Sequence, residues 1–471
     1  MTGAVAAIDL GATSGRVIVG HVGPDTLRME QVARFGNGPV DLGGSLHWDV
    51  TGLYAQSLAG LRDALRTTPG IVSIGVDSWA VDYALLRGGR LLGEPFHYRD
   101  ERTRAGAAAV DARLPHAKLY ARNGLQFLPF NTLYQLAAED PAVLEIADRL
   151  LLVPDLLAFW LTGRARTEVT NASTTGLLDA RTRAWDEDLI ARLGLPRGVF
   201  ADLVQPGAEI GRLRPVVAAA LGAPEALGVT AVGSHDTASA VVAVPMDPAT
   251  AVYISCGTWG LVGAEVAEPV LSDAARRAGF TNEGGVDDRI RLLHNVMGLW
   301  ILSETVRGWE REGERVDLPA LLAAAAAEPE PARVFDVDDE RFLAPGEMTA
   351  RIDAWYAEHD VAPPRTRAAY ARAIVESLAE AFARTAHQAA ELAGIDLRTI
   401  HIVGGGALNT LLCERTATRA GVRVLAGPVE ATALGNVLVQ ARAHGLVHGT
   451  LEDLRTLVAR THEVTEHRPG R

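Results

Sequence analysis

The opening third of the chain alternates short apolar runs with one amphipathic stretch. Apolar runs at residues 5–10, 16–21 and 27–34 are separated by turn residues and predict strands. Apolar positions at helical spacing predict a helix over 50–67, and another strand follows at 71–76. Strands interleaved with helices are typical of an α/β fold, in which helices cover a sheet.

The same alternation continues through the rest of the chain. The sequence predicts helices over 132–139, 141–161, 212–227, 319–328 and 365–392, and strands over 229–232 and 400–403. The polar segment after Arg460 is predicted to be a loosely ordered tail.

The length of the chain predicts two domains. Its 471 residues are 48% hydrophobic, and a single core seldom grows beyond about 250–300 residues. The segment Val244-Pro245-Met246-Asp247-Pro248 carries two prolines and has the composition of a hinge. We therefore predict similar globular domains at residues 1–244 and 245–471.

One kind of turn occurs twice, once near the start of each predicted domain. The segments are Ile8-Asp9-Leu10-Gly11-Ala12-Thr13-Ser14-Gly15-Arg16 and Ile254-Ser255-Cys256-Gly257-Thr258-Trp259-Gly260. In both, an apolar strand runs into a turn of glycine and hydroxyl residues and then into a second strand. Backbone N–H groups and hydroxyls in such turns can surround phosphate oxygens. Two such turns facing one another would hold a nucleotide between two domains.

Charge and hydropathy exclude several classes of partner. The formal net charge is −13 and the chain has no basic run, so we expect no binding to nucleic acid or to an anionic membrane. No run of eighteen apolar residues and no signal-like N-terminus occurs, which predicts a cytoplasmic protein without a membrane span.

Lysine and cysteine are both scarce. Lys118 is the only lysine, so a Walker A loop, a protein-kinase site and a Schiff-base mechanism are all excluded. Cys256 and Cys413 are the only cysteines, too few for a disulfide framework or a cysteine-rich metal site. We expect both to be reduced thiols.

Two features favour nucleotide binding. Asp9 ends an apolar strand beside a glycine turn, where a carboxylate can hold hydrated Mg²⁺ against nucleotide phosphates; its alternative role is to cap the loop. Residues 403–409 follow a strand and contain three consecutive glycines, which would let an adenine ring or ribose approach the backbone. A tight turn without a ligand is the alternative there, and the dinucleotide-binding spacing is absent.

Asp236 is the candidate catalytic base. It lies in Ser234-His235-Asp236-Thr237, between a strand and an apolar helix, so it stands at the helix start, where an ionised carboxylate is favoured. Such a group can orient a substrate hydroxyl and accept its proton late in phosphoryl transfer; capping of the helix is the alternative. The segment Asp77-Ser78-Trp79-Ala80-Val81-Asp82 predicts a wall for a polyol, to which Asn295 could add an amide.

Taken together, these segments resemble the FGGY carbohydrate kinases and, within them, the rhamnulokinases. The resemblance runs from about Ala4 to Ala443. It also includes the segments Tyr98-Arg99-Asp100, 124–136, Thr170-Asn171-Ala172-Ser173-Thr174-Thr175, Thr281-Asn282-Glu283-Gly284-Gly285 and 426–431.

The resemblance implies two actin-like, ribonuclease-H-like domains with a catalytic cleft between them. It implies that the enzyme uses ATP with Mg²⁺ and phosphorylates a ketose at O1, which for the rhamnulokinases gives L-rhamnulose 1-phosphate. The N-terminal domain would bind the sugar and supply the base, and the C-terminal domain would bind the nucleotide.

Site residues follow from the matching positions. Asp236 would be the base, and His235, Thr237 and Asn295 would contact the sugar. The nucleotide would be bound by Ala12, Thr13, Ser14, Gly15, Arg16, Thr258 and Gly405, the last at the adenosine. Two positions depart from the family pattern: Ala80 stands where a glycine contacts the sugar, and Ser303 stands where a glutamine is expected near the nucleotide.

Two alternatives remain open from the sequence. The substrate could be another ketose, namely L-fuculose, D-xylulose or L-ribulose, because sugar-facing residues distinguish members of this family. The chain could also be a non-catalytic, ATP-dependent sugar sensor on the same fold. As to assembly, we expect a monomer or a homodimer.

Overall fold

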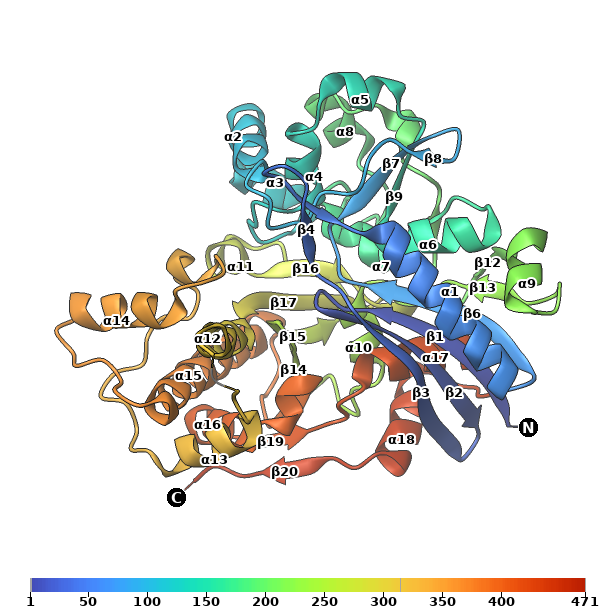
Figure 1. The fold of residues 1–471 in the computed structure, drawn as a ribbon. Helices are drawn as coiled ribbons and strands as arrows, with labels where there is room; N and C mark the ends of the chain where they lie inside the picture. The colour runs from blue at the N-terminus through green and yellow to red at the C-terminus, as the bar shows by residue number, and fades with distance from the viewer. Residues whose placement is uncertain (1, 314, 471) are drawn as a thin grey trace. The chain divides into compact units, whose positions relative to one another are not determined.

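A computed structural model describes residues 2–313 and 315–470 (Figure 1). The chain forms two compact units, each assembled from separate stretches of sequence. Unit 1 comprises Met1–Pro245, Glu265–Leu292 and Ala431–Thr461, and unit 2 comprises Met246–Ala264, Leu293–Glu430 and His462–Arg471. The first crossing between units falls at the predicted hinge. The assignment of sugar and nucleotide binding to residues 1–244 and 245–471 stays a prediction.

The main sheet of unit 1 has six strands in the order β12-β13-β6-β1-β2-β3. Strand β1 is antiparallel to β2 and parallel to β6, so its carboxyl end meets that of β6 at one edge of the sheet. The strands are β1 (Gly3–Leu10), β2 (Ser14–Gly23), β3 (Thr26–Gly36), β6 (Ile71–Ser78), β12 (Glu209–Arg212) and β13 (Gly228–Thr230).

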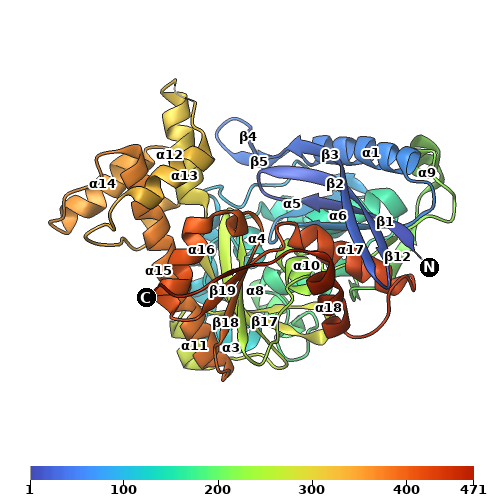
Figure 2. The same ribbon diagram turned by 90° about the horizontal axis from the view of Figure 1, so that it is seen from below.

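Helices cover both faces of this sheet (Figure 2). Helix α1 (Val50–Thr67) packs through Gly60 on Val17 and Ala33, whereas α17 (Ala431–Ala443) packs through Val437 on Gly20. Positions 17 and 20 of β2 point to opposite faces because side chains alternate along a strand. The other helices that pack around this sheet are α6 (Val153–Thr162), α9 (Pro215–Leu221), α10 (Asp236–Val242) and α18 (Leu451–Thr461).

A second, smaller core lies in the same unit. It is built on the three-stranded sheet β8-β7-β9, and its buried side chains include Leu133, Leu150 and Leu189. Its elements are β7 (Tyr83–Arg87), β8 (Arg90–Leu91), β9 (Arg149–Leu152), α2 (Thr103–Arg113), α3 (His116–Asn123), α4 (Thr132–Ala137), α5 (Pro141–Ile146) and α8 (Glu187–Leu193). Short elements complete the unit: β4 (Pro39–Asp41), β5 (Leu46–Trp48), β10 (Thr167–Glu168), β11 (Leu203–Val204), β16 (Thr281–Gly284), α7 (Val169–Ala172) and α11 (Asp273–Arg277).

The sheet of unit 2 contains the consecutive strands β17-β15-β14-β18-β19-β20. Its elements are β14 (Ala251–Cys256), β15 (Trp259–Val266), β17 (Ile290–Met297), β18 (Thr399–Val403), β19 (Arg423–Ala426), β20 (Thr465–His467), α12 (Trp300–Arg311), α13 (Leu318–Ala327), α14 (Met348–Glu358), α15 (Arg367–Ala393) and α16 (Thr410–Ala420). The division between units falls within β15 and β17, so each of these strands has residues in both.

The two units repeat one strand arrangement. In unit 1, β1 and β2 form a hairpin and β6 lies parallel to β1; in unit 2, β14 and β15 form a hairpin and β18 lies parallel to β14. Each hairpin is closed by one of the two turns that the sequence singled out. The repeat of a turn in the sequence is therefore a repeat of a supersecondary unit.

Three predicted elements are wrong. The helix expected over 141–161 is α5, β9 and α6 in succession, because the apolar run 150–152 pairs with β7 before Pro154 opens a new helix. The helical stretch expected over 212–227 is helical only in α9. The tail expected to be loose contains β20, which pairs with β19 from Val424 to Ala426.

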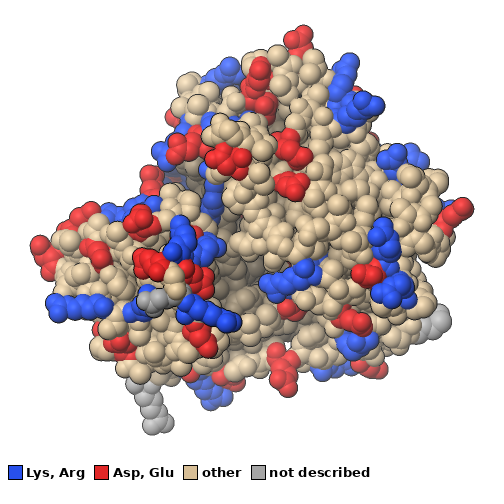
Figure 3. Space-filling view, in the orientation of Figure 1, with Lys and Arg blue, Asp and Glu red and all other residues tan. Residues whose placement is uncertain are grey.

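Charges of both signs alternate over the visible face of the molecule (Figure 3). Among the described residues, none of the helices combines the length and the apolar content needed to cross a bilayer. The predicted lack of nucleic-acid partners stays a prediction.

Candidate active site

Two carboxylates lie side by side where the parallel strands β1 and β6 end. Asp9 is paired in register with Asp77, and both are buried. Arg16, across the hairpin on β2, donates from Nη2 to Asp9 Oδ2 at 2.5 Å. The sequence predicted Asp9 as a site residue and Arg16 as a nucleotide contact, and the structure joins the two in an ion pair.

Asp77 is held by a helix that lies far away in the sequence. Asn436 of α17 donates from Nδ2 to Asp77 Oδ2 at 2.5 Å, and Gln440, one turn on, donates to Asn436 Oδ1 and to the carbonyl of Ala6. Asp77 Oδ1 is buried without a hydrogen bond. Burial, together with the nearby Asp9 carboxylate, raises the pKa of Asp77 well above its usual range.

Asp236 is the first residue of α10 and is the most accessible of the three carboxylates. Its side chain keeps 32% of its surface exposed, whereas that of Asp9 keeps 5%. The end of β6 holds the segment before Asp236, because the backbone N–H of Ser78 donates to the carbonyl of Ser234 at 2.9 Å. Burial, and to a lesser degree the Asp9 carboxylate, raises the pKa of Asp236 against the opposing effect of His235. Thr237 Oγ1 donates to Asp236 Oδ1 at 3.1 Å.

Glu168 anchors the loop that leads into Asp236, and sequence reasoning missed it. Its Oε2 accepts hydrogen bonds from the backbone N–H of Ser234 at 3.0 Å and from Ser234 Oγ at 2.8 Å. It also accepts from Thr170 Oγ1 at 2.6 Å, which belongs to a segment quoted only for its resemblance. Burial raises the pKa of Glu168, while these donors oppose the rise.

His235 is buried between two residues that sequence reasoning also missed. Its Nδ1 lies 3.1 Å from Arg291 Nη2 and 3.2 Å from Glu283 Oε2, and its Nε2 lies 3.3 Å from Asp236 Oδ1. Arg291 and Glu283 form an ion pair of 3.1 Å. Burial opposes ionisation of Glu283, but the guanidinium group of Arg291 holds its pKa below the usual value.

The predicted polyol wall is partly wrong, because Asp82 is already saturated. Its Oδ2 accepts from the indoles of Trp48 and Trp79 at 2.6 and 3.0 Å and from the backbone N–H of Tyr98 at 3.2 Å, and its Oδ1 accepts from Gln135 at 2.8 Å. A carboxylate with four donors has little capacity left for a sugar hydroxyl. Asp82 therefore shapes the turn.

That turn contains Ala80 and a strained neighbour. Val81 has a φ of +69°, a rare conformation for a β-branched residue, and its carbonyl accepts a hydrogen bond from Thr132 Oγ1 at 2.6 Å. The backbone N–H of Asp82 donates to the carbonyl of Ala80 at 2.9 Å. Strain of this kind is characteristic of functional sites, and here it lies next to Ala80, where the resemblance implies a glycine.

The hydroxyl-bearing residues of the turn between β1 and β2 are accessible from outside. The N–H of Gly11 donates to the carbonyl of Ser14 at 2.9 Å, and Asn37 contacts the turn through the carbonyls of Gly11 and Thr13. Thr13 is exposed, and Ala12 and Ser14 are half-exposed. Gly15 is a steric requirement, because a Cβ there would lie 2.2 Å from the ring of Phe35.

The predicted nucleotide residues of unit 2 surround the matching turn between β14 and β15. The N–H of Trp300 donates to the carbonyl of Thr258 at 3.2 Å, so α12 starts against this turn and Ser303 lies exposed in its first helical turn. Gly405 follows β18 and is exposed, with its nearest possible Cβ contact 4.0 Å away on Cys256. Asn295 lies half-buried on β17.

Close approach explains the neighbouring glycines without any ligand. A Cβ on Gly404 would lie 2.9 Å from the Cys256 carbonyl, and one on Gly406 would lie 2.3 Å from Cys256 Sγ. Cys256 and Cys413 are both free thiols, as expected. The glycine run therefore serves packing at its two ends and leaves only Gly405 open.

The carboxylates of unit 1 fit a cation that also binds phosphate. Among the described residues, no group of three or more metal-ligating side chains occurs. Magnesium bound with a nucleotide needs only one or two carboxylates, because phosphates and water complete its coordination. Asp9 and the unpartnered Oδ1 of Asp77 meet that requirement.

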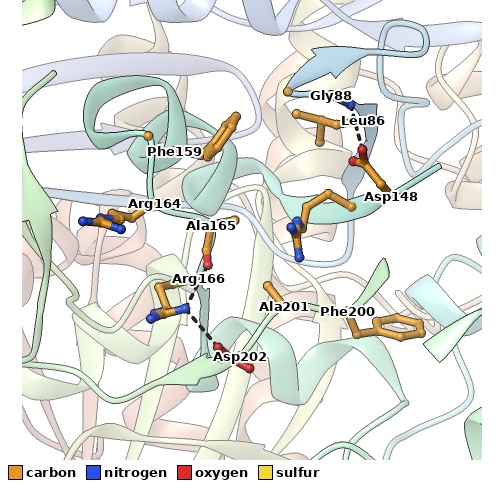
Figure 4. A pocket seen from close by; sticks show the side chains of 13 residues that line it. Leu86, Gly88, Asp148, Phe159, Arg164, Ala165, Arg166, Phe200, Ala201 and Asp202 are labelled. Carbon is orange, nitrogen blue, oxygen red and sulfur yellow. Dashed lines mark hydrogen bonds and ion pairs between the residues drawn. The ribbon is translucent and has the colours of Figure 1, made fainter. Parts of the chain in front are cut away.

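A cavity of about 500 Å³ lies elsewhere in unit 1, by the turn after β7 and the loop after α6 (Figure 4). Some of its polar groups are paired: Arg166 pairs with Asp202 at 3.0 Å, and Asp148 accepts from the N–H of Gly88. None of the predicted site residues lines it. The candidate site is therefore the cluster at the ends of β1 and β6.

The sequence was compared with known families and proteins. Residues 4–243 match the N-terminal domain, and residues 252–444 the C-terminal domain, of the FGGY family of carbohydrate kinases. The chain belongs to this family. The predicted family is thereby confirmed, and with it the predicted activity class: the chain is a phosphotransferase with an alcohol group as acceptor.

Two relatives match nearly the whole chain. It is 40% identical over 441 residues to the rhamnulokinase of Oceanobacillus iheyensis, covering 93% of this chain and 92% of that protein. It is 41% identical over 442 residues to the rhamnulokinase of Klebsiella pneumoniae, covering 92% and 88% respectively.

Solved structures confirm the fold class. A gluconate kinase from Lactobacillus acidophilus superposes with a TM-score of 0.80 at 16% identity, covering 100% of this chain and 94% of that chain. A xylulose kinase from the same organism gives a TM-score of 0.79, also at 16% identity, covering 99% and 94%. At these identities the similarity concerns the fold alone, which is the two-domain, actin-like α/β fold that the sequence predicted.

Proposed function

We propose that this protein transfers the γ-phosphoryl group of ATP to O1 of L-rhamnulose, giving L-rhamnulose 1-phosphate and ADP. The choice of sugar is supported by the two rhamnulokinases that match more than nine-tenths of the chain. The observation that carries the chemistry is the placement of Asp236, an accessible carboxylate at a helix start beside two buried ones.

Asp236 acts as the base in this proposal. The sugar O1–H bond breaks as O1 bonds to the γ-phosphorus, the bond from that phosphorus to the β–γ bridging oxygen breaks, and the proton passes to the Asp236 carboxylate. The raised pKa of Asp236 suits this role, because a base is most effective when its pKa lies closer to the working pH. Thr237 orients the carboxylate through Oδ1.

The nucleotide is assigned to residues of both units. Ala12, Thr13, Ser14, Gly15 and Arg16 would bind phosphates from unit 1, and Thr258, Ser303 and Gly405 would bind the nucleotide from unit 2. Asp9, with Asp77 beside it, would hold Mg²⁺. When bound, this cation would neutralise charge on the phosphate oxygens. The protein groups bind and orient, which supplies most of the catalysis in phosphoryl transfer.

The sugar is assigned to His235, Asp236, Thr237, Asn295 and the backbone at Ala80. The hydrogen bonds that fix Val81 and Asp82 keep this backbone rigid, so the methyl group of Ala80 has a constant position. A fixed methyl group in place of a hydrogen atom narrows the site on that side. We therefore expect discrimination among ketoses to depend on residue 80.

Release of ADP measured with four ketoses tests the substrate. We expect the highest kcat/KM with L-rhamnulose and lower values with L-fuculose, D-xylulose and L-ribulose. Phosphorus NMR of the product should show a phosphate ester on O1. A higher kcat/KM with another ketose would refute the proposed sugar, and no ADP release with any of them would refute the kinase activity.

The variant Asp236→Asn tests the base. We expect it to fold and to bind sugar, while kcat falls by roughly 10² or more, the usual effect of removing an acid–base group. Asp63→Asn, on the exposed side of α1, is the matched control and should keep full activity. The alternative of a non-catalytic sensor predicts ATP binding without turnover in the parent protein, so the parent enzyme alone distinguishes the two.

A further inference from the structure

Arg291 is buried directly behind the candidate site. It lies on β17, and no part of its side chain is exposed. Its Nε donates to the carbonyl of Gly284 at 2.9 Å, which fixes the plane of the guanidinium group. Its Nη2 lies 3.1 Å from His235 Nδ1 and 3.1 Å from Glu283 Oε2. This arrangement places a permanent cation against the inner nitrogen of the histidine.

The geometry decides which nitrogen of His235 carries the proton. A guanidinium group has only donors, so the hydrogen bond from Arg291 requires a lone pair on Nδ1. Glu283 Oε2 would require the opposite state, but it makes no hydrogen bond of acceptable geometry. The ring proton therefore sits on Nε2, which lies 3.3 Å from Asp236 Oδ1.

We propose that Arg291 is a positioning residue for phosphoryl transfer, which holds His235 as the neutral Nε2–H tautomer, with Nε2 3.3 Å from Asp236 Oδ1. This inference rests on the proposed function for its catalytic consequence. His235 Nε2 then lies 3.3 Å from Oδ1 of Asp236, and Thr237 Oγ1 donates a hydrogen bond to the same oxygen. Oδ2 is the oxygen that remains to accept the proton of the sugar hydroxyl.

Glu283 is the reason why the tautomer of His235 should change when Arg291 is removed. Without the guanidinium group, Nδ1 is free to carry the proton and donate to Glu283 Oε2, which lies 3.2 Å away. Nε2 would then present a lone pair, in place of an N–H group, to the Asp236 carboxylate 3.3 Å away, and the two would repel one another. Arg291 and Glu283 thus favour opposite tautomers of one ring.

The parent protein provides the first test. With ¹⁵N-labelled histidine, long-range ¹H–¹⁵N correlation spectra report the protonation of each ring nitrogen, and His235→Gln identifies the signals by their loss. We expect an unprotonated Nδ1 and a protonated Nε2. A protonated Nδ1, alone or with Nε2, would overturn the proposal whether or not the protein phosphorylates any sugar.

Arg291→Met, alone and combined with Glu283→Gln, provides the second test. In the single variant we expect the His235 signals to change to the Nδ1–H pattern and kcat to fall roughly 10- to 100-fold, as expected for a displaced catalytic group. In the double variant the amide of Gln can donate to Nδ1, so we expect the Nε2–H pattern to return and at least part of the lost kcat to be recovered.

Arg289→Met is the matched control. Arg289 is two residues away, and its guanidinium group pairs with Glu265 and Glu452, so we expect unchanged His235 signals and an unchanged kcat. An Arg291→Met protein that keeps the Nε2–H pattern, or a double variant that keeps the Nδ1–H pattern, would refute the role of Arg291. Wild-type protein with the expected tautomer but no activity on any ketose would instead refute the proposed function.

Discussion

At the scale of single residues, surroundings decide what each aspartate can do. Asp82 receives four hydrogen bonds and stabilises a turn, Asp77 receives one and keeps a buried oxygen unpaired, and Asp236 is partly exposed. From the sequence, Asp236 was the candidate base, and Asp77 and Asp82 belonged to the predicted polyol wall. Unpaired acceptors separate the site carboxylates from the structural one, because only they have capacity for a substrate or a cation.

The surroundings of His97 should make the free energy of unfolding depend on pH. Burial and the nearby Arg99 lower its pKa to about 3, against the opposing effect of Asp100, and the N–H of Arg99 donates to its Nδ1 at 3.0 Å. The unfolded chain therefore binds more protons than the folded one between about pH 6.5 and pH 3. Stability is fully present above pH 6.5 and falls as the pH drops through this window.

The variant His97→Phe checks this prediction, since phenylalanine can still stack on Trp48 and Tyr98. Between pH 7 and pH 4 we expect the free energy of unfolding of the parent to fall by about 3 kcal/mol more than that of the variant, at 1.36 kcal/mol per pKa unit. Urea unfolding at both pH values measures it. Equal pH dependence in the two proteins would contradict the assignment.

At the scale of elements, the site is held by the packing of α10 on α17. A Cβ on Gly435 would lie 1.7 Å from the carbonyl of Ser239, so the two helices meet backbone to backbone at this point. Helix α10 begins with Asp236, and α17 carries the Asn436 that binds Asp77. Gly435 thus sets the distance between α10, which begins with Asp236, and α17, which binds Asp77 through Asn436.

Gly435→Ala should displace these helices. We expect a loss of about 1–3 kcal/mol of stability, the usual result of overpacking, and a fall in kcat because Asp236 moves. Gly308→Ala is the matched control, since it also lies in a helix but has nothing within 4 Å of its Cβ position. That change should be neutral or stabilising by up to about 1 kcal/mol. Thermal unfolding and steady-state kinetics measure both variants; equal behaviour would contradict the role given to Gly435.

At the scale of the whole molecule, the two units repeat one hairpin with one parallel neighbour, yet they carry different groups. The carboxylates are in unit 1, whereas Thr258, Ser303 and Gly405 are in unit 2. The proposed reaction needs groups of both units on one pair of substrates. Exclusion of water from that complex would prevent transfer of the phosphoryl group to water instead of sugar.

We therefore expect the substrates together to make the molecule more compact. Small-angle scattering should show a smaller radius of gyration with L-rhamnulose and a non-hydrolysable ATP analogue than with either alone. The Asp236→Asn variant should contract as well, because it keeps its substrate contacts. Unchanged dimensions with both ligands would contradict closure.

Much of the fold was predictable because the conformation of many elements depends on short stretches of sequence. The strands on either side of Gly11 and Gly257 and the helix over 50–67 all depend on residues that are neighbours in the chain. The helix predicted over 141–161 failed for the same reason. A buried strand of three apolar residues between two helices has the same local pattern as one buried helix.

The sequence by itself determined the repeated turns, the family and the position of Asp236 at a helix start. Only the tertiary structure decided what surrounds that aspartate. Glu168 reaches Ser234 across 66 residues, Arg291 reaches His235 across 56, and Asn436 reaches Asp77 across 359. Periodicity and turn chemistry describe the conformation of adjacent residues, whereas buried polar pairs form wherever packing brings a donor to an acceptor. No local pattern in one sequence indicates which distant donor will contact which acceptor.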